Sequence, residues 1–190
     1  MSYIKDNFLL TNKTAERLYF NYAKNMPIFD YHCHLSEKQI LENLLRGYAL
    51  DIQHVGSTSI PGISAKPIID IAVAVKDKQA LLDIIPILTK AGYDVKNSID
   101  DKGEVLGAKG GPECRTHYVH VEPFESEYWN NHILFRDYLL SHPEYISQYE
   151  EVKTKVLEQF KERKLYTAHK NDFIKSIIEL AKEEQSKRLV

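Results

Sequence analysis

The sequence predicts an α+β fold, in which a small mixed β-sheet is flanked by helices and followed by a C-terminal helical group. Short apolar runs rich in β-branched or aromatic residues are typical of strands, and they occur at 49–56, 67–75, 93–99 and 115–122. The segments between them carry apolar residues at helical spacing. The last third of the chain keeps this helical spacing almost throughout.

The N-terminal part predicts two helices joined by a short extended run. Residues 13–24 have helical periodicity, and Pro27 ends that helix because the residue before a proline avoids helical backbone. Residues 28–31 are expected to be extended. The stretch Ser36–Gln39 has the spacing of a capping box, so a second helix is predicted over 36–46.

The elements between the strands follow from the same criteria. Lys78–Ala91 predicts an amphipathic helix that Pro86 should kink or divide. Residues 101–112 contain four glycines and a proline, and we expect a loop there. The C-terminal helices are predicted at 127–140, 143–162 and 167–186.

Composition limits the classes of function. The chain has 190 residues, of which 43% are hydrophobic and 27% charged, and its net charge of −2 argues against binding nucleic acid through a basic surface. Cys33 and Cys114 form neither a CxxC motif nor a disulfide framework, as is usual in a reducing compartment. No signal peptide is evident, and no apolar run approaches the roughly 18 residues that span a bilayer. We therefore expect a cytoplasmic protein without a membrane partner.

One acid, Asp70, interrupts the apolar run at 67–75. A carboxylate in such a strand is costly unless a cation or a metal compensates its charge. The preceding strand ends at Gly56-Ser57, where backbone N–H groups at the start of a short helix would suit a phosphate. The pattern therefore predicts a phosphate held beside a metal-binding carboxylate. A plain turn capped by Ser57 and a structural acid bonded to loop amides remain open.

Several motifs follow one another in the region 46–190. They are HVGSTSIPG at 54–62, AKPIIDI at 65–71, RTHYVHV at 115–121, HILFRDYLLSHPE at 132–144, YEEVK at 149–153 and YTAHKNDFI at 166–174. Together they resemble the GrpB family. The resemblance implies a sheet of nucleotidyltransferase-like type, and the biochemical role of the family is poorly defined.

The leader has a different resemblance. The start of uronate isomerases is similar to residues 5–43, KDNFLLTNKTAERLYFNYAKNMPIFDYHCHLSEKQILEN. In that family, the histidines that match His32 and His34 are the first part, in sequence order, of a metal site on a barrel. Such a barrel needs about 250 residues, so isomerase activity is not expected here. Metal capture by the two histidines remains open, since alternate residues of a strand share a face.

We interpret the chain as a join, with a uronate-isomerase-like leader at 1–45 and a GrpB-like domain at 46–190. The leader is expected to form a helical arm that packs on the domain or mediates homo-oligomerisation, because the apolar face of a helix is stabilised when it is buried against another surface.

The nucleotidyltransferase-like resemblance, for Gly56, Ser57 and Asp70, and the chemistry of the other residues together give a set of candidate site residues. Phosphate or substrate would be bound by Gly56, Ser57, Thr58, Arg115, His117 and Lys170. Asp70 and His120 would be the catalytic pair and would hold a divalent metal, Mg²⁺ or Mn²⁺. Arg115 and His117 also fit an ordinary surface strand pair, and Lys170 an ordinary solvated lysine.

One departure from the nucleotidyltransferase pattern bears on catalysis. The paired acids D-x-D become Asp70-Ile71-Ala72, and alanine cannot bind the second ion that two-metal transfer requires. His120 is a candidate second ligand, whereas His117 should point to the opposite face of its strand. Three functions remain open: a metal-dependent nucleotidyl or phosphoryl transferase with an unknown small-molecule or protein acceptor, a non-catalytic nucleotide- or anion-binding module, and an inactive isomerase remnant.

Overall fold

The computed structural model describes residues 31–96, 99–101, 103–111, 114–159 and 163–188. Contacts divide the chain into two units, Met1–Cys33 and His34–Val190, and the description below concerns the second unit. This division lies nearer the N-terminus than the boundary after residue 45 that we expected. The helix expected at 13–24 lies outside the described residues.

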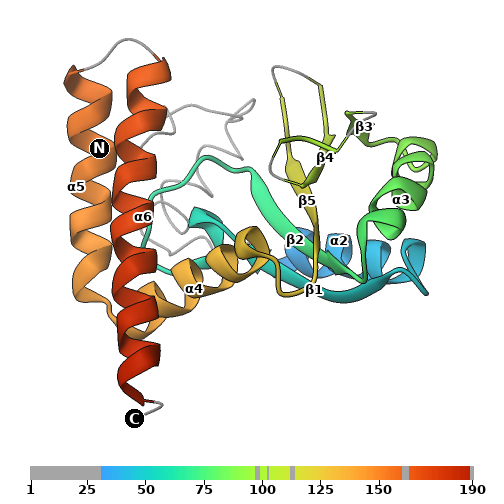
Figure 1. Cartoon of the computed structure of the whole chain (residues 1–190). Helices are drawn as coiled ribbons and strands as arrows, with labels where there is room; N and C mark the ends of the chain where they lie inside the picture. The colour runs from blue at the N-terminus through green and yellow to red at the C-terminus, as the bar shows by residue number, and fades with distance from the viewer. Residues whose placement is uncertain (1–30, 97–98, 102, 112–113, 160–162, 189–190) are drawn as a thin grey trace, which may run out of the picture. The chain divides into compact units, whose positions relative to one another are not determined.

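A five-stranded mixed sheet forms the centre of the second unit (Figure 1). The strand order is β1-β2-β5-β4-β3, with β2 parallel to β5 and antiparallel pairing elsewhere. The strands are β1 Ala49–Val55, β2 Ile69–Val75, β3 Asp94–Val95, β4 Val105–Lys109 and β5 His117–Pro123. The predicted α+β fold with a small mixed sheet is confirmed.

In the described part of the chain, five helices and one 3₁₀ turn accompany the sheet. They are α2 Tyr31–Leu44, η2 Ser57–Ser59, α3 Lys78–Lys90, α4 Glu127–Ser141, α5 Glu144–Gln159 and α6 Arg163–Arg188. Side-chain caps fix two of the helix starts, since Asp77 accepts a hydrogen bond from the amide of Ala80 and Ser126 accepts one from the amide of Trp129.

One face of the sheet is covered by α2 and α3. Leu41 and Leu45 are fully buried in the same cluster as Ile71 and Val73 of β2. Glu37 of α2 is also buried, and it accepts hydrogen bonds from the hydroxyl of Tyr93 and, at 3.0 and 3.1 Å, from Lys109 Nζ. Residues of the isomerase-like leader therefore complete this core.

The opposite face of the sheet is covered by α4. Trp129 packs there against Val55, Ala72 and Ala74, because alternate residues of β2 point to opposite faces. Helices α4, α5 and α6 share a separate core, and Figure 1 shows α5 and α6 running side by side. Its buried members are Ile60, Phe135, Leu139, Tyr149, Ile177 and Ile178.

Two expectations about local structure were wrong. The glycine-rich segment at 101–112 contains strand β4, which pairs with β5 on one side and β3 on the other. Tyr31–His34 is helical rather than extended, so His32 and His34 are not alternate residues of a strand. Of the two effects expected of Pro86, division of the helix does not occur, since Pro86 lies inside the single helix α3.

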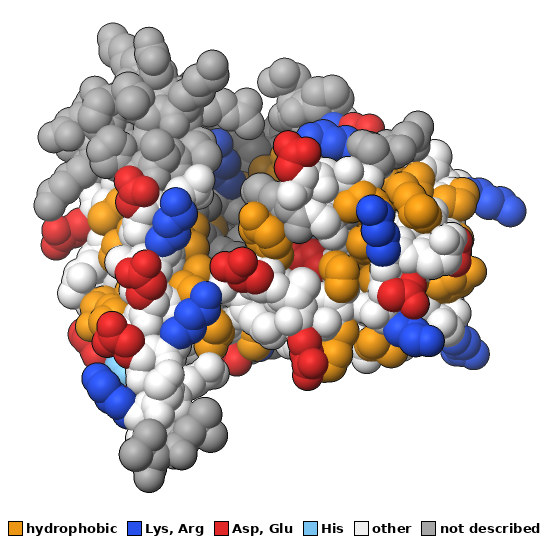
Figure 2. Space-filling view, viewed as in Figure 1, with side chains coloured by type: hydrophobic (Ala, Val, Ile, Leu, Met, Phe, Trp, Pro, Cys, Tyr) orange, Lys and Arg blue, Asp and Glu red, His pale blue; other side chains and the backbone are white. Residues whose placement is uncertain are grey.

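Charges of both signs are interspersed over the face drawn in Figure 2. Among the residues described, no helix has both the length and the apolar character needed to cross a bilayer.

Candidate functional site

The carboxylate of Asp70 lies against the sharp turn that follows β1, Gly56 with the 3₁₀ turn Ser57–Ser59, which we call the Gly56 corner. Strand β1 ends at Val55, the register partner of Asp70, and the chain turns at Gly56 with a φ of 72°. A Cβ at Gly56 would come within 2.5 Å of Asp70 Oδ2. Because only glycine combines this backbone with such a close approach, the sequence Gly56-Ser57 is what allows the carboxylate to face the corner. The side chain of Asp70 is 32% exposed, so a ligand can reach it.

The corner is closed by a single 3₁₀ turn. Ser59 donates to the carbonyl of Gly56 through its hydroxyl at 2.6 Å and through its amide at 3.2 Å. His54 Nε2 and Thr58 Oγ1 lie within hydrogen-bond distance, at 2.9 Å. A turn of three residues has little macrodipole, so the helix-dipole contribution expected for anion binding is small.

A hydrogen bond from Tyr149 of α5 connects the Gly56 corner to the helical group. The Tyr149 hydroxyl lies 3.1 Å from Ser57 Oγ, and Ser64 donates its amide to Glu150 of the same helix at 2.9 Å. Burial and the charges of Asp70 and Glu150 raise the pKa of Tyr149 to about 12, against the opposing hydrogen bond with Ser57. Tyr149 therefore remains a neutral phenol that fixes the hydroxyl of Ser57.

His120 of β5 lies between two carboxylates. Its Nδ1 is hydrogen-bonded to Glu104, whose side chain is 9% exposed, and its Nε2 lies 3.7 Å from Asp70 Oδ1. Burial disfavours the charged ring and so lowers the pKa of His120. The hydrogen bonds with Asp70 and Glu104 and the negative charges of these two residues outweigh burial and raise the pKa to about 10. Because 3.7 Å is longer than a direct hydrogen bond, we attribute the effect of Asp70 mainly to its charge.

A second acid–imidazole pair lies behind His120, beneath α4. Glu122 is 1% exposed, and its Oε1 lies 3.3 Å from His132 Nε2. The rings of His120 and His132 are 5.0 Å apart between centroids. Neither carboxyl oxygen of Glu122 makes a hydrogen bond within the described residues, so this buried group depends on its contact with His132.

The structure brings together Gly56, Ser57, Thr58, Asp70 and His120, and places two other expected phosphate ligands elsewhere. Arg115 pairs with Asp94 and donates to the carbonyl of Gly110 at 2.6 Å. His117 is on the opposite face of the sheet, near Glu37, because it is an odd number of residues from His120 on a regular strand.

Lys170 is on α6, and its side chain lies outside the described residues. Two surface hollows, one beside Lys182–Lys187 and one between α2 and β1, include none of the corner residues.

The residues present fit a divalent cation only in part. Within the part of the chain described, no three side chains of His, Cys, Asp or Glu form a metal centre. His120 Nδ1 is hydrogen-bonded to Glu104, and its Nε2 lies 3.7 Å from Asp70 Oδ1. Asp70 keeps an exposed carboxylate, which suits a Mg²⁺ ion whose remaining ligands are phosphates and water.

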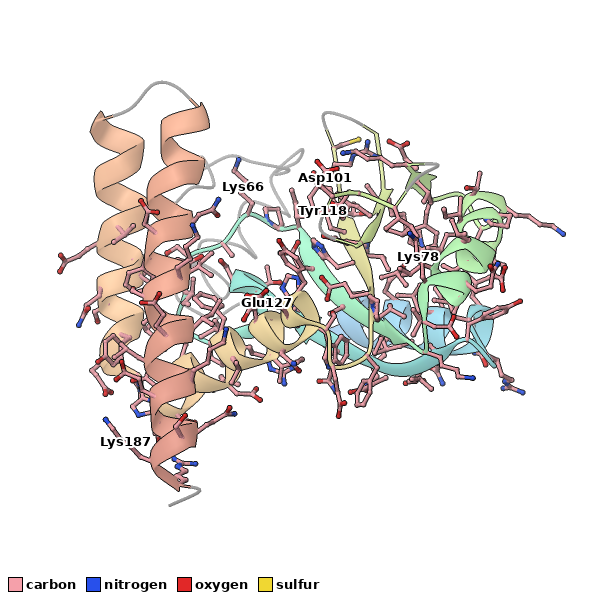
Figure 3. The ribbon with its side chains drawn as sticks, in the orientation of Figure 1. Lys66, Lys78, Asp101, Tyr118, Glu127 and Lys187 are labelled. Carbon is pink, nitrogen blue, oxygen red and sulfur yellow. The ribbon has the colours of Figure 1, made fainter. Side chains whose placement is uncertain are left out.

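Sequence reasoning missed Glu104, Tyr149 and the Glu122–His132 pair. Glu104 falls in the segment that we expected to be a loop, and the other three belong to elements whose packing a sequence does not show. The one available signal was alternation along β5, which puts His120 and Glu122 on the same face as Tyr118. Figure 3 labels Tyr118, the β5 register partner of Asp70, and Lys66 on the segment that leads into β2.

Comparison with known proteins decides the family. A family model described as GrpB protein matches residues 24–180. The chain belongs to the GrpB family. The expected resemblance is thereby confirmed, and the match begins at residue 24, before the expected start of the GrpB-like domain at residue 46.

Relatives of this GrpB chain include proteins named for the family. The glutamate-rich protein GrpB of Alkalihalophilus pseudofirmus is 36% identical over 150 residues, which cover 75% of this chain and 84% of that protein. The UPF0157 protein YqkA of Bacillus subtilis is 34% identical over 151 residues, or 79% of this chain and 44% of that protein. A crystal structure of conserved protein GrpB from Enterococcus faecalis has a TM-score of 0.70 and 30% identity, covering 80% of this chain and 91% of that one.

A short segment of the GrpB chain is also similar to uronate isomerases, as expected for its leader. The isomerase of Bacillus subtilis is 73% identical over 37 residues, which cover 20% of this chain and 8% of the isomerase. The isomerase of Bacillus licheniformis is 63% identical over 41 residues, or 22% of this chain and 9% of that protein. Both resemblances are therefore present in one chain, as the interpretation of a join requires.

Proposed function

We propose that this GrpB chain binds the phosphates of a nucleotide at the Gly56 corner, through a divalent cation held by Asp70, and transfers a nucleotidyl or phosphoryl group. The observation that carries the proposal is the position of the Asp70 carboxylate, which faces the corner and is partly exposed. A phosphate alone would be repelled by this carboxylate, so a cation between them is required.

The surrounding residues of the chain would prepare the corner for this ligand. Gly56 leaves room for the carboxylate, and Tyr149 fixes the hydroxyl of Ser57 beside it. His120, oriented by Glu104, supplies positive charge next to Asp70. When bound, the cation would neutralise phosphate charge, and the chain would contribute mainly positioning and electrostatic stabilisation.

A second candidate is a module that binds a nucleotide with its cation but does not turn it over. It is favoured by Ala72, which is fully buried against Trp129 where the nucleotidyltransferase pattern has a second acid. This candidate predicts the same binding without release of pyrophosphate or phosphate.

The isomerase candidate receives no support from the fold. The described residues form a five-stranded mixed sheet rather than an eight-stranded parallel barrel, and His32 and His34 lie in helix α2. Incubation with a uronate should give no keto-sugar.

Thermal unfolding with Mg²⁺ and each common nucleoside triphosphate tests the proposal. A ligand at 100 times its dissociation constant should add about 2.7 kcal/mol to the free energy of unfolding. The rise should require both metal and nucleotide, and addition of EDTA should abolish it. If no nucleotide changes the unfolding temperature in the presence of Mg²⁺, the proposal is wrong. Phosphorus NMR of the same mixtures separates turnover from binding alone.

A further inference from the structure

We infer that the side chains of Asp51, Gln53 and Arg136, here called the edge cap, keep a second copy of this chain from pairing with strand β1. The inference goes beyond the proposed function and does not depend on it. In the described sheet, with the order β1-β2-β5-β4-β3, the two edge strands are β1 and β3. Strand β3 has two residues and β1 has seven, so β1 is the edge long enough to accept another strand.

The hydrogen bonds of β2 show which residues of β1 face outward. The amide of Ile69 donates, at 2.9 Å, to the residue that precedes β5, and the carbonyl of Val75 accepts, at 2.7 Å, from the residue that follows β5. The odd-numbered residues of β2 therefore direct their backbone groups toward β5. Because these directions alternate along a strand, the even-numbered residues of β2 bond to β1. Their register partners in β1 are odd-numbered, so Ile52 and His54 present their backbone groups to the edge.

Each of these two outward residues already has one backbone group bonded to a side chain. Asp51 Oδ1 accepts the amide of Ile52 at 2.7 Å, and Arg136 Nη1 of α4 donates to the carbonyl of His54 at 3.0 Å. In an antiparallel pair, a hydrogen-bonded residue exchanges both its N–H and its C=O with the residue opposite. A second strand would therefore form complete pairs with Ile52 and His54 only by displacing both side chains.

Gln53 joins the two capping side chains into one unit. Its Nε2 donates to both carboxylate oxygens of Asp51, at 3.1 and 2.9 Å, and its Oε1 accepts from Arg136 Nη1 at 2.8 Å. Arg136 is also held by Asp137 at 2.7 Å, and its side chain is 16% exposed. Strand pairing would break this network and remove its charges from water, which costs free energy.

A second copy of this chain is the partner that the edge cap excludes, because the regular part of β1 is self-complementary. The register shifts between Ala49 and Asp51, which confines the regular edge to 51–55, with Gln53 at its centre. Two antiparallel copies centred on Gln53 would pair Ile52 of each with His54 of the other and give a twofold dimer. This register uses the outward groups of both residues in both copies.

Removal of the edge cap tests the inference on the full chain. The uncapped variant combines Asp51→Ala with Arg136→Met, and Arg46→Met is the control, because Arg46 donates to the nearby side chain of Asn43. Sedimentation velocity over a concentration series should show dimerisation of the uncapped variant that is at least about tenfold stronger than that of wild type or control, since pairing no longer breaks the capping bonds.

Hydrogen exchange should place the new contact at β1. The amides of 49–55 should become better protected in the uncapped variant as its concentration rises, and those of wild type should not. A folded uncapped variant that dimerises no more than wild type would overturn the inference. So would wild-type protection at 49–55 that rises with concentration as it does in the variant.

Gln53→Lys, added to the uncapped variant, separates strand pairing from aggregation of unfolded chains. It places two lysines directly opposite each other at the centre of the dimer, where like charges are destabilising, so the dimer should be lost. A dimer that survives this change would overturn the inference. Fluorescence of Trp129, which is buried against β1 and β2, reports whether each variant keeps its fold. If the double variant unfolds, Arg136→Met alone takes its place and should show a smaller increase in dimerisation.

Discussion

The Oδ2 atom of Asp70 occupies space that a side chain at Gly56 would need, since a Cβ there would approach it to 2.5 Å. This contact joins the end of β1 to the start of β2 and makes the corner a single structural unit. It also makes Gly56 the residue whose replacement most directly disturbs the Asp70 carboxylate.

Gly56→Ala should destabilise the fold and displace Asp70. The backbone of Gly56, with φ 72° and ψ −171°, alone costs alanine about 1–3 kcal/mol, and the contact with Asp70 adds to it. Gly62→Ala is a matched control, because Gly62 has a φ of 84° but no atom within 4 Å of the place that a Cβ would take. Urea unfolding should show the larger loss for Gly56→Ala, together with weaker Mn²⁺ binding; equal losses and unchanged binding would contradict the role of the contact.

The hydrogen bond between Ser57 and Tyr149 should contribute to stability in a way that a double-mutant cycle detects. Tyr149→Phe and Ser57→Ala each remove one partner of the 3.1 Å contact, and each should cost about 0.5–1.5 kcal/mol. The double variant should cost less than the sum of the two, because the same contact is lost only once. Strict additivity in chemical denaturation would show that the two hydroxyl groups do not interact.

The contact between Glu122 and His132 should respond unequally to removal of its two members. His132→Ala leaves the buried carboxyl group of Glu122 without the imidazole that it faces, and an unsatisfied buried acceptor costs about 1–3 kcal/mol. Glu122→Gln keeps a polar group opposite His132 and should cost clearly less. Denaturation of both variants at pH 7 gives the comparison, and a greater loss for Glu122→Gln would mean that the carboxyl group does not depend on His132.

The buried Glu37 should make stability depend on acid pH. Burial disfavours its ionised form, but hydrogen bonds from Tyr93 and Lys109 and the charges of His117 and Lys109 outweigh it and hold the pKa of Glu37 below its ordinary 4.5. A carboxyl group with a lowered folded-state pKa stabilises the fold above the unfolded pKa, and this contribution is lost as the pH falls through the folded value.

Glu37→Gln should therefore be less stable than wild type at pH 7, and the difference should shrink as the pH falls below about 4.5. Glu42→Gln is the control, because Glu42 is on the same helix but exposed, with Lys38 at 3.9 Å. That control should change stability little at any pH. A wild-type advantage over Glu37→Gln that stays constant down to pH 3 would contradict the assignment.

The part of the site made by adjacent residues could be predicted from sequence. An acid in an apolar strand and a Gly-Ser pair at the end of the preceding strand are local patterns, and antiparallel pairing of β1 with β2 brings Gly56 and Asp70 together. The same alternation correctly separated His117 from His120.

The rest depended on packing that local patterns do not encode. Glu104 reaches His120 only because β4 pairs with β5, and the glycines at 103, 107 and 110 made this segment resemble a loop. Tyr149 reaches Ser57 across 92 positions of sequence through the core of the helical group. Helix α2 begins at Tyr31, before the capping-box signal at Ser36, and the family match also extends into the leader.

Asp70→Asn tests the central claim most directly. Isothermal titration with Mn²⁺ and α,β-methylene-ATP should show binding to wild type that weakens at least tenfold, or about 1.4 kcal/mol, when the carboxylate becomes an amide. Asp83→Asn, which removes a partly exposed carboxylate of α3, should bind like wild type. If Asp70→Asn binds metal and nucleotide with the affinity and stoichiometry of wild type, the carboxylate at the Gly56 corner does not hold the cation and the account is wrong.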